Sequence, residues 1–147
     1  MHFFVNDSRR AEDGLIQLAP GNKEQVVREG KQTRLLLGYD TKEKMTLRTL
    51  LILMRKAIQM AKSLQCTSLS VTLPEWHFPK LKLSEGELIE LLATNAMLAD
   101  YAFNQYKTPP KEGFIHITRI NFLGVKEKKA AEACLKRAKI IAEETNA

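Results

Sequence analysis

The sequence predicts an α/β domain with a three-layer α/β/α arrangement around a mixed sheet. Short apolar runs crowd the first forty residues, and two helix-like segments farther on are separated by a strand-like one. Strands joined by helices imply right-handed crossovers and parallel pairing, although the first strands can pair antiparallel. With 147 residues, 44% of them hydrophobic and 27% charged, the chain is sized for one domain, 1–147.

The N-terminal part predicts short strands. Four apolar runs carry this prediction, at residues 2–5, 15–18, 25–28 and 33–38. The fourth is the strongest, because Leu35, Leu36 and Leu37 follow one another without a polar residue. Such a run is typical of a central strand covered on both faces.

A long amphipathic helix is predicted over residues 46–65. Thr46 is placed to cap it, and its apolar side chains recur at intervals of three and four. These side chains are Leu47, Leu50, Leu51, Met54, Ile58, Ala61 and Leu64. The alternating segment 68–73 then predicts a strand that ends at Pro74.

The second half of the chain predicts two more helices with a strand between them. Ser84 and Glu87 fit a capping box, so the first of these helices begins at Ser84. The strand covers 114–120, and the last helix runs from Lys126 to the C-terminus.

Charge and cysteine content restrict the class of protein. The net charge of +6 lets the chain approach acidic partners without establishing one. The sequence lacks a signal peptide and an apolar run of about 18 residues, which predicts a cytoplasmic location and no membrane contact. Cys66 and Cys134 are far apart and form no CxxC pair, so both are predicted to be reduced and structural.

No motif for catalysis, cofactor binding or metal binding emerges from the sequence. Its glycines are not spaced as GxGxxG or as a P-loop, and it contains neither HExxH nor G-x-S-x-G. Glu85, Glu87 and Glu90 fit the start of a helix, where carboxylates are favoured. Asp100 has no obvious acidic partner, and His116 is interpreted as solvent-facing or hydrogen-bonded. We therefore predict no catalytic, cofactor-binding or metal-binding residue here.

Basic residues gather around the first long helix. They are Lys42, Lys44, Arg48, Arg55, Lys56 and Lys62, with Glu43 as the acid in that region. A solvated helix face is the favoured interpretation. The alternative is a nucleic-acid surface in which Arg48, Arg55 and Lys56 contact phosphates.

The loop 74–79 holds the single tryptophan of the chain. Trp76, His77 and Phe78 follow the predicted strand 68–73, at the sheet edge where α/β proteins bind ligands. We expect either a loop held by its own aromatic side chains or covered by another domain, or the wall of a ligand cleft.

Three stretches of the sequence resemble the N-terminal domain of the leucyl aminopeptidases, the cytosol aminopeptidase family. LLLG at 35–38 followed by KMTLR at 44–48 is similar to the family's apolar strand, glycine and K-L-T-L helix start. ADYAFNQYK at 99–107 is similar to L-G-x-Y-x-F-x-x-Y-K, although Asp100 stands where the family usually has glycine. AKIIAEETN at 138–146 resembles the helix that leads into the family's catalytic domain.

The resemblance implies a macro-domain-like fold and a non-catalytic domain that serves assembly and substrate access. The parent would be a hexameric metallo-aminopeptidase that removes N-terminal residues from peptides, with two divalent metals, zinc or manganese, in its catalytic domain. Nothing in this sequence matches that domain's N-T-D-A-E-G-R-L motif. The expected partners are the parent's own catalytic domain and further copies. The alternative is a stand-alone macro-like module that binds ADP-ribose, a nucleotide or DNA.

Overall fold

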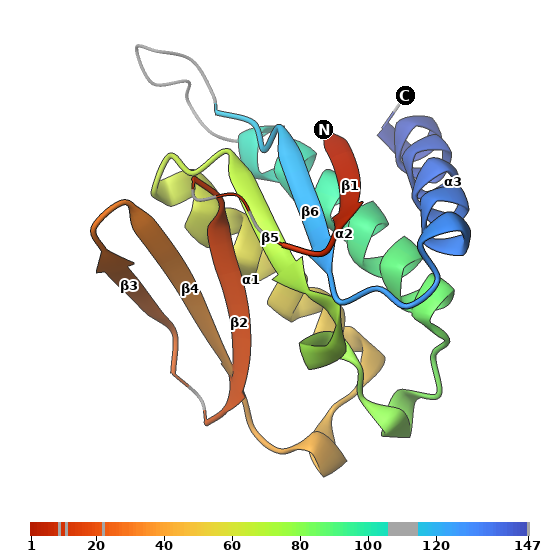
Figure 1. Ribbon diagram of the computed structural model, residues 1–147, viewed down its shortest axis with the longest axis horizontal. Coiled ribbons are helices and arrows are strands. Elements are labelled where there is room, and N and C mark those ends of the chain that lie inside the picture. The colour runs from red at the N-terminus through yellow and green to blue at the C-terminus, as the bar shows by residue number, and fades with distance from the viewer. Residues whose placement is uncertain (9, 11, 22, 106–114, 147) are drawn as a thin grey trace.

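The computed structural model describes residues 1–8, 10, 12–21, 23–105 and 115–146 and shows a six-stranded mixed sheet with three α-helices (Figure 1). The predicted α/β class with a mixed sheet is confirmed. The strands are β1 (His2–Asn6), β2 (Gly14–Pro20), β3 (Gln25–Glu29), β4 (Gln32–Tyr39), β5 (Ser68–Thr72) and β6 (Arg119–Leu123). Their order in the sheet is β1-β6-β5-β2-β4-β3.

Parallel pairing dominates the sheet. The pairs β1–β6, β6–β5, β5–β2 and β2–β4 are parallel, and β3–β4 is antiparallel. Antiparallel pairing at the N-terminus is therefore confined to the β3–β4 hairpin, where Gly30 supplies a positive φ of 61° in the turn. β1 and β2 do not touch, because β6 and β5 lie between them.

The helices form one layer on one face of the sheet (Figure 1). They are α1 (Leu47–Ser63), α2 (Glu85–Gln105) and α3 (Lys128–Asn146). α2 packs against both α1 and α3, while α1 reaches β4 and α3 reaches β1. None of these described helices combines the length and apolar character that a membrane span needs.

The described residues of the segment between β1 and β2 cross the opposite face of the sheet (Figure 1). The Asn121 side chain donates a hydrogen bond to the Ser8 carbonyl at 3.3 Å. The Ser70 hydroxyl donates one to the Asp13 carboxylate at 2.8 Å. Because both donors alternate with core residues along their strands, the crossing segment lies on the side away from the helices.

The core lies between the sheet and the helix layer. Alternate residues of the central strands face it and are fully buried: Ile16, Leu35, Leu37, Leu69, Val71, Ile120 and Phe122. On α1 the buried apolar side chains are Leu50, Leu53, Met54, Ala57, Ile58 and Ala61. The structure corrects one detail of the predicted strand 33–38, because Leu36 points to the other face and stays partly exposed.

Two boundaries near the C-terminus differ from the prediction. The strand expected over 114–120 is β6, Arg119–Leu123, and Phe114 lies outside the described residues. The Ile117 amide donates to the Asp100 carboxylate, so this part of the chain is held by α2 before it enters the sheet. α3 begins at Lys128 rather than at Lys126, because the Lys126 amide donates to the Glu85 side chain.

Candidate functional site

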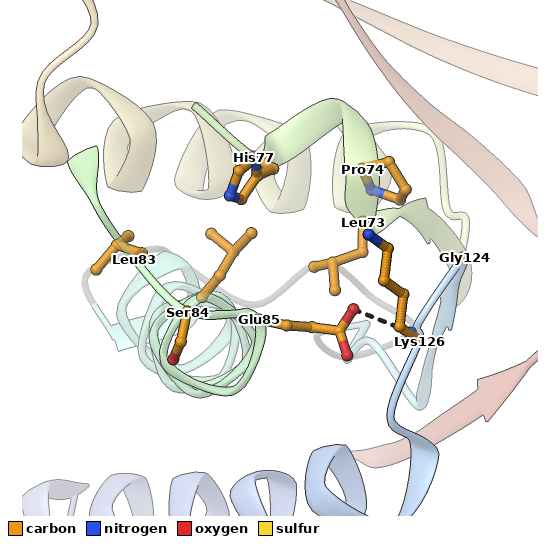
Figure 2. A pocket seen from close by; sticks show the side chains of 9 residues that line it. Leu73, Pro74, His77, Leu83, Ser84, Glu85, Gly124 and Lys126 are labelled. Atoms are coloured by element: carbon orange, nitrogen blue, oxygen red, sulfur yellow. Dashed lines mark hydrogen bonds between the residues drawn. The ribbon is translucent and has the colours of Figure 1, made fainter. Parts of the chain in front are cut away.

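A pocket of about 340 Å³ opens at the carboxyl ends of β5 and β6 (Figure 2). This is the edge at which parallel α/β sheets place their ligands. Its walls come from the segment after β5, from the start of α2 and from the turn after β6. The lining residues are Leu73, Pro74, His77, Leu83, Ser84, Glu85, Leu88, Gly124 and Lys126.

The start of α2 is built from two side chains with different tasks. The Ser84 hydroxyl accepts a hydrogen bond from the Glu87 amide at 3.1 Å, as a helix cap does. The Glu85 carboxylate accepts the amides of Lys126 and Glu127 at 2.9 and 3.0 Å. Glu85 therefore holds the start of α3 against the start of α2 at one side of the pocket (Figure 2).

Gly124 allows the turn after β6 to lie close to the segment after β5. Its φ of +75° is in the left-handed region, and a Cβ atom there would come within 2.8 Å of the Pro74 ring. Glycine meets both demands because it has no side chain. The pocket that results is walled by leucines, with His77, Glu85 and Lys126 as its ionisable side chains.

The aromatic loop predicted at 74–79 divides between core and pocket. Trp76 is fully buried, and its indole nitrogen has no hydrogen-bond partner among the described residues. Phe78 is 3% exposed, and its ring packs edge-on against the Tyr39 ring, with 5.1 Å between the two ring centroids. His77 is the member of the trio that lines the pocket (Figure 2).

The basic residues singled out on α1 lie at its surface. Arg48, Arg55 and Lys56 are all exposed. The Lys56 ammonium lies 3.0 Å from the Glu24 carboxylate, so an acid distant in sequence neutralises part of this surface. Ahead of α1, the Lys44 ammonium lies 3.3 Å from the carboxylate of Asp40, four residues earlier in the chain.

Lys62 does not belong to that solvated face, which corrects the sequence interpretation. Its side chain is 1% exposed, and its ammonium lies 2.7 Å from the Asp100 carboxylate and 2.9 Å from the Asp100 carbonyl. The other Asp100 oxygen lies 3.1 Å from the His116 ring. The helical periodicity could have predicted that Lys62 is buried, since it follows the buried Ile58 by four positions on the same helix face.

A second polar cluster was not predicted from the sequence. Asp13 is 1% exposed and accepts hydrogen bonds from the hydroxyls of Ser68 and Ser70 and from the Arg10 amide. Burial alone would raise the pKa of Asp13, but these hydrogen bonds and the nearby Arg119 outweigh it and hold the pKa below 3.8. Ser68 and Ser70 are two positions apart in a predicted strand, so the sequence already indicated that both lie on one face of the sheet.

Metal-binding and thiol chemistry find little support in the described part of the chain. No three or more His, Cys, Asp or Glu side chains gather there in a way that would hold a metal ion. The Cys66 thiol donates to the Ser68 carbonyl at 3.3 Å. Cys134 is buried on α3, against Gly86 of α2.

Comparison with known proteins connects this fold to one family. The family model described as cytosol aminopeptidase family, N-terminal domain, matches residues 26–110, which is more than half of the chain. No curated protein matches the sequence significantly. Among 23 significantly similar chains of solved structures is a mutant of tomato leucine aminopeptidase, with 12% sequence identity and a TM-score of 0.65. That likeness covers 96% of this chain and 36% of the tomato chain, so the chain spans about a third of that enzyme's length.

Proposed function

Because this chain belongs to the cytosol aminopeptidase family through its N-terminal domain, we propose that it is the non-catalytic part of a metal-dependent leucyl aminopeptidase. The observation that carries the proposal is the family match over residues 26–110, which includes β4, α1, β5 and α2. The parent protein hydrolyses N-terminal residues from peptides in the cytoplasm. Its two divalent metals, zinc or manganese, are held by a catalytic domain outside this sequence, where they activate water and polarise the scissile carbonyl.

The proposed role of the domain is assembly and substrate access in a hexameric parent. The sheet face away from the helices supports this role. Leu15, Leu36 and Val27 are only half-buried there, next to the half-buried Arg34. A surface that mixes apolar and polar side chains in this way is typical of interfaces between domains.

The catalytic part of the proposal is tested with the purified chain and a chromogenic leucine amide. We expect no release of the chromophore with added zinc or manganese, because the metal-binding side chains lie elsewhere in the parent. Release that depends on metal and stops with a chelator would contradict the proposal. The reading frame beyond Ala147 provides an independent check, since a continuation carrying N-T-D-A-E-G-R-L would support it.

The assembly part is tested by charge substitution on the open sheet face. Leu36→Asp, introduced into the chain joined to its catalytic domain, is expected to reduce hexamer formation in light scattering while circular dichroism stays unchanged. Val26→Asp is the matched control, because Val26 is 38% exposed and its register with Leu35 places it on the opposite face of β3. Equal effects of both substitutions would argue against an interface on the open face.

The pocket favours a second candidate, a macro-like module that binds ADP-ribose or a nucleotide. Its position at the carboxyl ends of β5 and β6 suits a nucleotide. The Glu85 carboxylate counts against this candidate. It lines the pocket beside the helix start where a pyrophosphate, also negatively charged, would bind. Titration calorimetry with ADP-ribose decides between the candidates: we expect no binding at millimolar ligand, and a saturable signal that Glu85→Gln strengthens would favour the module.

A further inference from the structure

A groove of about 410 Å³ runs between the edge strand β1 and helix α3. Figure 1 shows α3 beside β1 at one end of the sheet. The lining residues are His2, Phe3, Phe4, Val5 and Asn6 from the strand, and Glu132, Leu135, Lys136 and Lys139 from the helix. The groove lies apart from the pocket at the start of α2 and shares no lining residue with it.

The strand side of the groove offers unpaired backbone groups. Among the strands that the structure describes, β1 has β6 as its one neighbour, and the His2 amide donates to the Thr118 carbonyl at 2.8 Å. In a parallel ladder the N–H and C=O groups of alternate residues point to opposite sides of the strand. The amides and carbonyls of Phe3 and Val5 therefore point away from β6, toward the open edge. An edge of this kind is a template for a further strand.

β1 lacks the usual features that block edge pairing. Its sequence, HFFVN, contains no proline and no lysine, and its register with β6 runs without a bulge from His2 to Asn6. Phe4 is 39% exposed, so the strand also offers apolar contact to an incoming segment. These properties allow the edge to accept an extended chain along its full length.

The helix side of the groove is positively charged toward one end. Positions 132, 135, 136 and 139 lie on one face of α3, because they are three or four residues apart. α3 runs back along β1, as the ion pair between Lys128 and Asp7 at 2.7 Å shows, so Lys139 lies toward the His2 end. Neither Lys136 nor Lys139 forms an ion pair with a described residue.

We propose that β1 and α3 form a docking groove for an extended acidic peptide segment of a partner protein. The segment adds to the sheet beside β1 and exchanges backbone hydrogen bonds with Phe3 and Val5. Its carboxylates pair with Lys136 and Lys139. A second copy of this chain fits less well, because β1 itself carries no carboxylate and two copies would bring together chains of charge +6. The proposal concerns a different surface from the open sheet face proposed for assembly and does not depend on that role.

The first experiment uses a blocked peptide of alternating valine and glutamate and its glutamine counterpart. Titration calorimetry with the full chain is expected to show about tenfold tighter binding of the glutamate peptide, since two exposed ion pairs contribute this much. Backbone NMR is expected to show the Phe3 and Val5 amides shifting on binding. No saturable binding, or equal binding of both peptides, would overturn the proposal.

Substitutions and a modified probe separate the groove from general attraction to a basic protein. Lys136→Ala/Lys139→Ala is expected to remove the preference for glutamate. Lys23→Ala/Lys31→Ala loses the same charge at exposed positions flanking β3, the other edge strand, and is expected to keep the preference. A glutamate peptide methylated on alternate backbone nitrogens is expected not to bind. Self-association of the chain that Val5→Pro abolishes would instead assign the edge to a second copy and overturn the proposal.

Discussion

At the scale of single residues, the buried pair of Lys62 and Asp100 joins three parts of the chain. Lys62 is on α1, Asp100 is on α2, and the same carboxylate accepts the amide of Ile117 ahead of β6. A buried charge without its partner costs more than the pair contributes, because its solvation is not replaced. Substitution of Lys62 or Asp100 is therefore expected to disturb the packing of α1, α2 and the segment ahead of β6 against one another.

We predict that Lys62→Met lowers the free energy of unfolding by about 3–5 kcal/mol, because it leaves the Asp100 carboxylate buried without its cation. Urea unfolding measures this loss. Lys62→Met/Asp100→Asn should recover part of it, since asparagine carries no charge and still accepts the Ile117 amide. Lys56→Met removes an exposed ion pair and should cost at most about 1 kcal/mol. Equal losses for Lys62→Met and Lys56→Met would refute the role assigned to the buried pair.

Asp13 should make the protein less stable in acid. Its pKa is held below 3.8 in the folded state, so its carboxylate stabilises the fold fully above that pH and loses this contribution as the pH falls through the lowered pKa. Compared with Asp13→Asn, the wild-type protein should therefore keep its advantage at neutral pH and lose it as the pH falls below 3.8 in urea unfolding.

Glu75 provides a control for Asp13, because its contribution to stability should change with pH in the opposite direction. Burial raises its pKa above 4.5, although its carboxylate accepts the Leu18 amide at 3.3 Å. Protonation of Glu75 thus favours the folded state, and the contribution is lost as the pH rises through 4.5 and the raised pKa. Glu75→Gln should gain relative to the wild type as the pH rises. A common trend for both residues would count against these pKa directions.

At the scale of elements, two turn glycines allow the cost of backbone strain to be distinguished from the cost of a steric collision. Gly124 has a φ of +75° and lies against Pro74, whereas Gly30 has a φ of +61° with open space around it. Gly30→Ala should cost about 1 kcal/mol of backbone strain. Gly124→Ala adds a collision with the proline ring and should cost about 1–3 kcal/mol more. Thermal unfolding of both variants measures the difference, and a smaller loss for Gly124→Ala would show that the β6–α3 turn yields easily.

At the scale of the whole molecule, the net charge of +6 is not concentrated enough to predict tight nucleic-acid binding. Acidic side chains lie beside two of the basic residues near α1, as the pairs Lys56–Glu24 and Lys44–Asp40 show. We predict that duplex DNA binds more weakly than micromolar at physiological salt, with a log–log salt slope of about −0.9 for each phosphate contact. Fluorescence anisotropy measures both quantities. Submicromolar binding that charge reversal at Arg55 and Lys56 abolishes would establish α1 as a nucleic-acid surface.

The sequence by itself determined the elements whose signals are local. The Thr46 cap and the three-and-four spacing placed α1, and the Ser84 side chain caps α2 as its sequence predicts. The family resemblance also came from short stretches, and the match over residues 26–110 confirms it. Caps and periodicity depend on residues within one or two turns, so they can be recognised without knowing the fold.

Tertiary structure alone decided which partners the buried polar residues contact and which aromatic residues enter the core. Asp100 is 38 positions from Lys62, and Ser68 is 55 positions from Asp13, so neither pair leaves a trace in a local pattern. Trp76 enters the core while His77 beside it lines a pocket, because the short 3-10 turn after β5 sets their directions. The groove beside β1 likewise exists only because β1 and α3, which are far apart in the sequence, meet at one sheet edge. Contacts of this kind depend on how distant segments pack, and packing is a property of the folded chain as a whole.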